Sequence, residues 1–205
     1  VHYHLKPGGV TRVIENAVNA LEPFGHNVVV LAGEPYEGGA MLKTVVSPGL
    51  RYTQPNEKPD AGALAHSLKF AARGMVGGEP DVWHIHNHSL GKNSAMAEAA
   101  CKLAQNSGSV LLQMHDFAED GRPANYENLT RLTSIRNTLY PQAPHIHYAA
   151  LNARDQSFLA ASGVPADRLH LLPNPVTGAP ERAENPSKPK GLDCDHLFLY
   201  PTRAI

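Results

Sequence analysis

The chain has 205 residues, of which 42% are hydrophobic and 18% charged, and its formal net charge is −1. A chain of this length can bury one sizeable core in one or two domains. The 18 Lys and Arg residues form no run, which argues against a nucleic-acid-binding surface. No stretch approaches the roughly 20 apolar residues of a transmembrane segment, and no secretory signal is visible. Since the cysteines, Cys101 and Cys194, form neither a metal spacing nor a disulfide framework, we expect a cytoplasmic protein.

A pair of glycines, Gly8 and Gly9, separates an apolar, strand-like segment at residues 1–5 from a predicted amphipathic helix at residues 10–21. Glycines at such a junction let the chain turn sharply and let backbone amides approach an anion closely. We call residues 6–9 the diglycine loop and expect it to bind phosphate. The same pair would also serve as an ordinary tight turn. The three-glycine dinucleotide fingerprint and the phosphate-binding Gly-Lys-Ser/Thr motif are both missing from the sequence.

Strand-like and helix-like segments alternate along the rest of the chain. The predicted strands lie at residues 27–32, 43–46, 81–86, 110–114, 145–151 and 169–172. The predicted helices lie at residues 60–76, 93–106, 125–139 and 153–161, the last with Asn152 as its N-cap. This alternation predicts an α/β fold with a doubly wound parallel sheet, whose ligands bind beyond the carboxyl ends of the strands. We therefore expect the site in the loops at residues 6–9, 87–92 and 115–121, together with Asn152.

The composition changes after residue 176. Residues 177–194 are polar and rich in proline, as in a linker, and residues 195–205 again look like a strand that runs into a loop. We expect a domain at residues 1–176, this linker, and the first strand of a second domain, with further residues before Val1 and after Ile205. The apolar strand at residues 197–200 is expected to pair with this domain or with another copy of the chain, because unpaired strands seek partners.

Three histidines, His84, His86 and His88, alternate along one predicted strand, and this alternation would place them on one side. Imidazoles on one face are good zinc ligands, which keeps a metal hydrolase as an alternative function. Hydrogen-bonded core histidines are the more ordinary explanation, and we expect no metal.

Polar residues follow two of the predicted strands directly. Asn87 and His88 follow one strand, and His115 and Asp116 follow the next. A neutral histidine there can donate to a sugar hydroxyl or a leaving oxygen, and an aspartate can accept from hydroxyls. The alternative is that His115 and Asp116 cap the following segment, although their position slightly favours a functional role. Arg203 could hold a diphosphate through two parallel hydrogen bonds, or be an ordinary solvated arginine.

In order and spacing, these segments resemble the N-terminal half of the retaining glycosyltransferases of family 4, which have two facing Rossmann-like domains. The stretches that carry the resemblance are Pro-Gly-Gly-Val-Thr-Arg-Val-Ile at 7–14, Asp-Val-Trp-His-Ile-His-Asn at 81–87, Gln-Met-His-Asp at 113–116, Leu-Pro-Asn-Pro-Val at 172–176 and Leu-Phe-Leu-Tyr-Pro-Thr-Arg at 197–203. The resemblance implies a Rossmann-like acceptor-side domain, truncated at the start of the nucleotide-sugar-binding domain.

The resemblance also implies an activity, which is transfer of a sugar from a nucleoside-diphosphate sugar to an acceptor hydroxyl, with retention and without a cofactor other than this co-substrate. The residues implied are His115 for catalysis; Gly8, Gly9 and Arg203 for the donor diphosphate; and Asn87, His88 and Asp116 for the acceptor. The acceptor is a saccharide, a lipid or a small molecule, which leaves peripheral contact with a membrane surface open. Because most donor-binding groups of the family lie beyond Ile205, we expect the isolated chain to be inactive. A non-catalytic sugar- or phosphate-binding module of the same fold is the alternative.

Overall fold

The computed structural model describes residues 1–38, 42–54, 56–132 and 134–175, which belong to one compact unit, Val1–Pro175. The predicted linker at 177–194 and the predicted strand at 195–205 lie outside the described residues. The same holds for Arg203 and for the self-association predicted at 197–200. Within the described part of the chain, no helix has the length and apolar character needed to cross a membrane.

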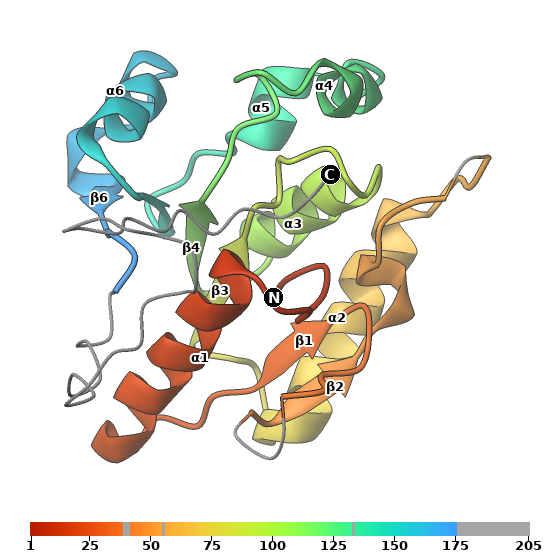
Figure 1. Cartoon of the computed structure of the whole chain (residues 1–205), viewed down its shortest axis with the longest axis vertical. Helices are drawn as coiled ribbons and strands as arrows, with labels where there is room; N and C mark the ends of the chain where they lie inside the picture. The colour runs from red at the N-terminus through yellow and green to blue at the C-terminus, as the bar shows by residue number, and fades with distance from the viewer. Residues whose placement is uncertain (39–41, 55, 133, 176–205) are drawn as a thin grey trace, which may run out of the picture. The chain divides into compact units, whose positions relative to one another are not determined.

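Helices and parallel strands alternate along this unit, as the sequence predicts (Figure 1). The strands are β1 (Val30–Ala32), β2 (Thr44–Val46), β3 (Val82–His86), β4 (Ser109–Met114), β5 (Ile146–Ala150) and β6 (Leu169–Leu171). The helices are α1 (Gly9–Leu21), α2 (Ala61–Val76), α3 (Met96–Gln105), α4 (Pro123–Leu129), α5 (Ile135–Leu139) and α6 (Ala153–Ala161), with short 3₁₀ turns η1 (Glu22–Phe24), η2 (Pro48–Leu50) and η3 (Ala166–Arg168).

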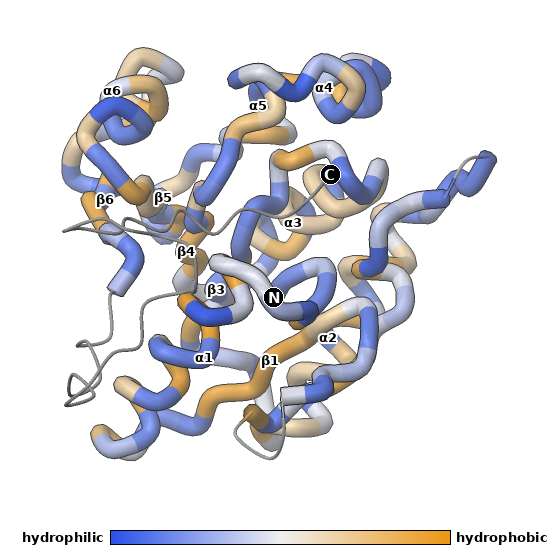
Figure 2. Tube along the Cα trace, viewed as in Figure 1, coloured by the Kyte–Doolittle hydropathy of each residue, from blue (hydrophilic) through white to orange (hydrophobic). Residues whose placement is uncertain are grey.

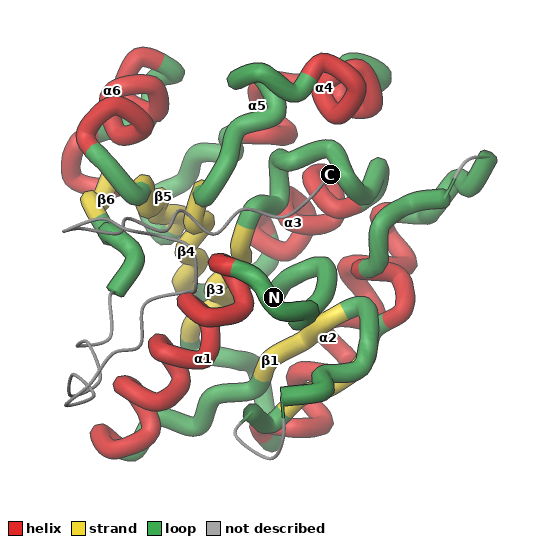
Figure 3. The backbone as a smooth tube through the Cα atoms, viewed as in Figure 1, coloured by secondary structure: helices red, strands yellow, loops and turns green. Residues whose placement is uncertain are grey.

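The N-terminal segment, residues 1–5, joins two groups of strands. β1 pairs with β2, and β3, β4, β5 and β6 pair in that order, all in parallel. The amide of His2 donates to Leu31 O at 3.1 Å, and the amide of His86 donates to Val1 O at 3.0 Å. The segment therefore lies between β1 and β3, although it forms only a single bridge to β1 and runs as a loop into α1 (Figure 3). The resulting order, β2-β1-segment-β3-β4-β5-β6, is that of a doubly wound Rossmann-like sheet.

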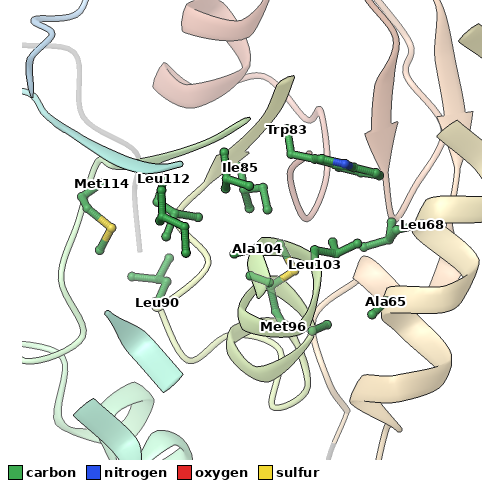
Figure 4. Packing of buried hydrophobic residues seen from close by; sticks show 14 of the residues in the cluster. Ala65, Leu68, Trp83, Ile85, Leu90, Met96, Leu103, Ala104, Leu112 and Met114 are labelled. Atoms are coloured by element: carbon green, nitrogen blue, oxygen red, sulfur yellow. The ribbon is translucent and has the colours of Figure 1, made fainter. Parts of the chain in front are cut away.

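Helices cover the two faces of the sheet through alternate strand residues. Trp83, Ile85 and Leu112 project from β3 and β4 against α2 and α3, as Figure 4 shows. On the other face, Val30 and Ala32 of β1 pack with α1. Both faces of β1 are thus buried, in agreement with its continuous run of hydrophobic residues (Figure 2). The predicted doubly wound α/β architecture is confirmed.

Side chains cap the first turns of two helices, at the predicted N-cap Asn152 and also at Asp60, which the sequence places inside the helix. Asp60 Oδ1 accepts hydrogen bonds from the first-turn amides of α2, Gly62 N at 2.6 Å and Ala63 N at 3.0 Å. Asn152 Oδ1 accepts from Asp155 N at 2.9 Å at the start of α6. These short side-chain acceptors fix where the two helices begin.

The predicted helix at residues 125–139 is wrong in its middle. The chain forms α4 and α5 instead, and Ser134 between them has a left-handed backbone with φ of 54°. Thr130 Oγ1 donates to Glu127 O at 2.8 Å at the end of α4. Such local side-chain bonds compete with helix continuation, and the break lets Leu129 and Leu139 pack in one small cluster.

Two predicted elements are shorter than expected. The helix predicted from residue 93 begins at Met96, because Asn93 Nδ2 donates to Gly49 O at 2.7 Å and to Arg51 O at 2.6 Å. The strand predicted at 27–32 contains only the residues of β1, which are the ones that pair with β2. Tertiary hydrogen bonds, invisible in the local pattern, set both limits.

Candidate functional site

The predicted loops meet at the carboxyl edge of the sheet, where the strand order reverses. The diglycine loop leaves the N-terminal segment on one side of this point, and the loop at residues 87–92 leaves β3 on the other. The loop at residues 115–121 follows β4 next to it. Crevices at such a switch point are where open α/β sheets bind ligands.

The diglycine loop leads directly into α1, a helix of 13 residues. Gly8 is its N-cap in an extended conformation, and no side chain of the described residues caps its first turn, which holds no acidic residue. A Cβ on Gly9 would meet nothing within 4 Å, and one on Gly8 would meet only Lys6 O at 3.7 Å. Neither packing nor backbone conformation therefore requires these glycines. Their absence of side chains leaves open space at the amino end of the helix, where an anion is favoured.

Asn87 ties the strands together beneath the edge. It has a left-handed backbone with φ of 53° and is 2% exposed. Its Oδ1 accepts from the amides of His115 at 2.7 Å and Asp116 at 3.2 Å, and its carbonyl accepts from Tyr3 Oη at 2.7 Å. Asparagine tolerates this conformation because its short polar side chain bonds locally. The structure thus buries Asn87 beneath this edge of the sheet, where its side chain holds the loop after β4.

His115 is half-buried at the start of that loop. Its Nε2 lies 3.0 Å from Nδ1 of His86, and the two rings stack with centroids 5.2 Å apart. His86 also stacks on His84 at 4.2 Å, and His84 Nε2 lies 2.8 Å from Gln113 Oε1. Burial lowers the pKa of His115 to about 4 and holds the pKa of His86 well below its usual range. Both rings are therefore neutral near pH 7.

His88 differs from the other two histidines of the run. His84 and His86 share one face, as predicted, but the left-handed turn at Asn87 ends the alternation and sends His88 into the core. His88 is 0% exposed, and its Nε2 bonds to Leu139 O at 2.7 Å. Burial lowers its pKa to about 4. The prediction that all three histidines face one side is wrong for His88, and we leave this buried ring out of the site.

The acidic and metal-ligating side chains of the described residues bear on two predictions, a metal site and an acceptor contact at Asp116. Among the described residues, no three histidine, cysteine or acidic side chains are arranged to hold a metal ion, so the metal hydrolase alternative has no ligand set there. Asp116 pairs with Arg122 at 2.8 Å, and both side chains are partly exposed. The Asp116 carboxylate therefore lies at the edge with a cation beside it.

Sequence reasoning missed an adjacent cavity and the partner of His115. Strand alternation suggests the side on which His86 lies, but the register that brings it to His115 comes from the β3–β4 ladder, which pairs His86 with Gln113.

The cavity, of about 310 Å³, is lined by Pro48, Gly49, Arg51, Thr53, Glu57, Lys58, Pro59 and Asn93. The cavity borders the loop at residues 87–92. The amide of Thr53, which lines the cavity, donates to Lys92 O in that loop at 3.0 Å.

The charges of this cavity are partly balanced. Arg51 Nη1 lies 3.0 Å from Glu57 Oε2, and Gln54 N donates to the same oxygen at 2.8 Å. Lys58 has no acidic partner within the described residues. The cavity therefore contains two cationic side chains and one carboxylate.

Comparison with known proteins identifies the family. The chain is similar to a mannosylglucosyl-3-phosphoglycerate synthase of Petrotoga mobilis, with 29% identity over 236 aligned positions that cover 100% of this chain and 44% of that protein. The chain thus spans less than half the length of this relative. No solved structure matches this chain. Residues 8–175, from the diglycine loop to the end of the described unit, match the glycosyl transferase 4-like domain, and the chain belongs to that family.

Proposed function

We propose that this chain forms the acceptor-side half of a retaining glycosyltransferase that uses a nucleoside-diphosphate sugar. The observation that carries the proposal is the open first turn of α1 at the switch point, where Gly8 and Gly9 are required by neither packing nor conformation. Such a turn suits the diphosphate of a donor. Family membership supports glycosyl transfer as the chemistry.

In this proposal, the edge residues have separate roles. Gly8 and Gly9 approach the donor diphosphate through their amides. His115 is the catalytic residue beside the transferred sugar, and Asp116 faces the acceptor. Asn87 acts as a positioning residue, because its side chain holds both of their amides. Arg203 stays a prediction for the diphosphate.

The proposed reaction needs charge stabilisation more than a nucleophile from the protein. The bond between the anomeric carbon and the diphosphate oxygen breaks while the acceptor oxygen forms a bond on the same face of the sugar. The acceptor proton passes to the departing diphosphate oxygen. Holding the two substrates together and stabilising the leaving group are the main contributions that a site of this kind makes.

For the acceptor, we propose a small molecule that carries a carboxylate or a phosphate. The name of the Petrotoga relative contains a phosphoglycerate group, which is anionic. The cavity beside the loop after β3 offers Arg51 and Lys58, of which Arg51 already holds a carboxylate, Glu57. A carboxylate or phosphate of the acceptor would take the same kind of contact.

The test is a screen of nucleotide sugars with the enzyme that contains this chain. We expect hydrolysis of one donor, and transfer to a glucoside of 3-phosphoglycerate but not to free glucose, with an unchanged anomeric configuration by NMR. Lys58→Ala should raise the KM for the anionic acceptor about tenfold. The matched change Lys43→Ala, on the exposed lysine that bonds to Asn27 Oδ1, should leave it unchanged. Donor binding without hydrolysis or transfer would favour the non-catalytic module, and an inverted product would refute retention.

A further inference from the structure

The imidazole rings of His86 and His115 form a hydrogen-bonded pair across β3 and the end of β4. His86 is the last residue of β3 and is 4% exposed, and its β4 partner Gln113 lies two residues before His115. Residues two apart on a strand share a face, so the β3–β4 register brings His86 and His115 together. Nδ1 of His86 and Nε2 of His115 are 3.0 Å apart, a distance at which one nitrogen donates and the other accepts.

Further contacts hold both residues of this pair in place. His86 stacks between His84, at 4.2 Å, and His115, at 5.2 Å. The backbone of His115 is held in turn by Asn87 Oδ1. Within the described residues, no group bonds to Nδ1 of His115, which is therefore the ring atom left for a ligand.

The direction of the bond between the rings follows from the chemistry of neutral imidazole. Each ring carries one proton, and the protonation of one nitrogen decides what the other can do. Neutral histidine more often carries its proton on Nε2. With both rings in that form, His115 Nε2–H donates to the lone pair on His86 Nδ1. Nδ1 of His115 is then an unprotonated acceptor.

We propose that His86 is a positioning residue that fixes the tautomer of His115, so that His115 presents Nδ1 to the site as a hydrogen-bond acceptor. This inference rests on the proposed function for its ligand, a sugar hydroxyl, which donates to Nδ1. It also narrows that function: His115 in this form accepts from a hydroxyl of the sugar and cannot donate to the leaving diphosphate. His86 touches no substrate and acts through the ring of its partner.

The structure offers a matched control on β5 and β6. Nδ1 of His147 lies 2.9 Å from Nε2 of His170, and these rings also stack, with centroids 5.1 Å apart. This pair has the same atoms in contact but lies on other strands. His147 is on β5, and β4 separates it from His84 on β3. Removing it tests whether loss of any paired imidazole has the same effect.

The experiment is long-range ¹H–¹⁵N NMR of the ¹⁵N-histidine-labelled chain, with His115 assigned by His115→Asn. In the wild type we expect Nδ1 of His115 to have the shift of an unprotonated nitrogen. His86→Phe should lower the Nε2–H to Nδ1–H ratio of His115 about fivefold, the effect of losing one ordinary hydrogen bond. His86→Asn, whose Oδ1 can reach the position of the lost nitrogen, should restore the ratio, and His147→Phe should not change it.

A proton on Nδ1 of His115 in the wild type, or an unchanged ratio in His86→Phe, would overturn the inference. The readout needs no turnover, so it is separable from the proposed function. If the ratio shifts as expected while the complete enzyme turns over no nucleotide sugar, the tautomer control stands and the proposed function fails. If the ratio shifts while His86→Phe keeps full turnover and an unchanged pH profile, the positioning role fails.

Discussion

Replacement of Asn87 by alanine should destabilise this unit by about 3 kcal/mol. Two hydrogen bonds are lost, from the amides of His115 and Asp116 to Asn87 Oδ1, and each contributes about 1 kcal/mol. A Cβ without a polar side chain at φ of 53° costs roughly 1 kcal/mol more. At a urea dependence of about 3 kcal/mol per molar, the unfolding midpoint should fall by about 1 M.

Two further variants separate the contributions. Asn87→Gly keeps the backbone conformation available and loses only the two bonds, so it should cost about 2 kcal/mol. Asn56 also has a positive φ, 69°, but is exposed, so Asn56→Ala should cost only about 1 kcal/mol. Urea unfolding followed by circular dichroism measures all three. The reasoning is refuted if Asn87→Ala costs no more than Asn56→Ala.

Three other changes test the site and the core. His115→Ala should lower turnover of the enzyme that contains this chain about 100-fold while costing only about 1 kcal/mol of stability, and unchanged activity would remove His115 from the mechanism. Gly9→Ala should raise the stability by about 0.5 kcal/mol, because its Cβ meets no atom within 4 Å, but should raise the KM for the nucleotide sugar; an unchanged KM would make the loop a simple turn. Burial lowers the pKa of His88 from 6.5 to about 4, so the unfolded chain binds the extra proton and the free energy of unfolding falls as the pH drops through this range. His88→Leu should reduce that slope by about 1.4 kcal/mol per pH unit in urea titrations at several pH values, and an equal slope would contradict the buried neutral ring.

The order and type of most elements could be predicted from the sequence, because they depend on local patterns. The helical spacing of Leu64 and Leu68, with Asp60 before it and Gly77 after it, gives α2 its bounds almost unchanged. The break at Ser134 could not be predicted, since it depends on how Leu129 and Leu139 meet a cluster formed by distant residues. Where tertiary contacts oppose local propensity, the pattern alone is insufficient.

For the site, the sequence locates the loops but does not show which side chains face the edge. It predicts His88 beside a ligand, whereas the turn at Asn87 buries the His88 ring against Leu139. It does not show that Asn87 holds the two amides after β4, nor that His86 reaches His115. Both contacts depend on strand register, which requires the long-range pairing to be known.

The central place of the N-terminal segment has a consequence for the order of folding. Tyr3 Oη bonds to Asn87 O, a partner 84 positions later in the chain. Closing such a distant contact loses chain entropy before the contact can stabilise the fold. Folds rich in such contacts therefore form slowly. During synthesis, residues 1–5 can pair with β1 early, but their contacts with β3 must wait until β3 has been made. The N-terminal segment, and the diglycine loop that follows it, are therefore translated well before the strand that completes their place in the sheet.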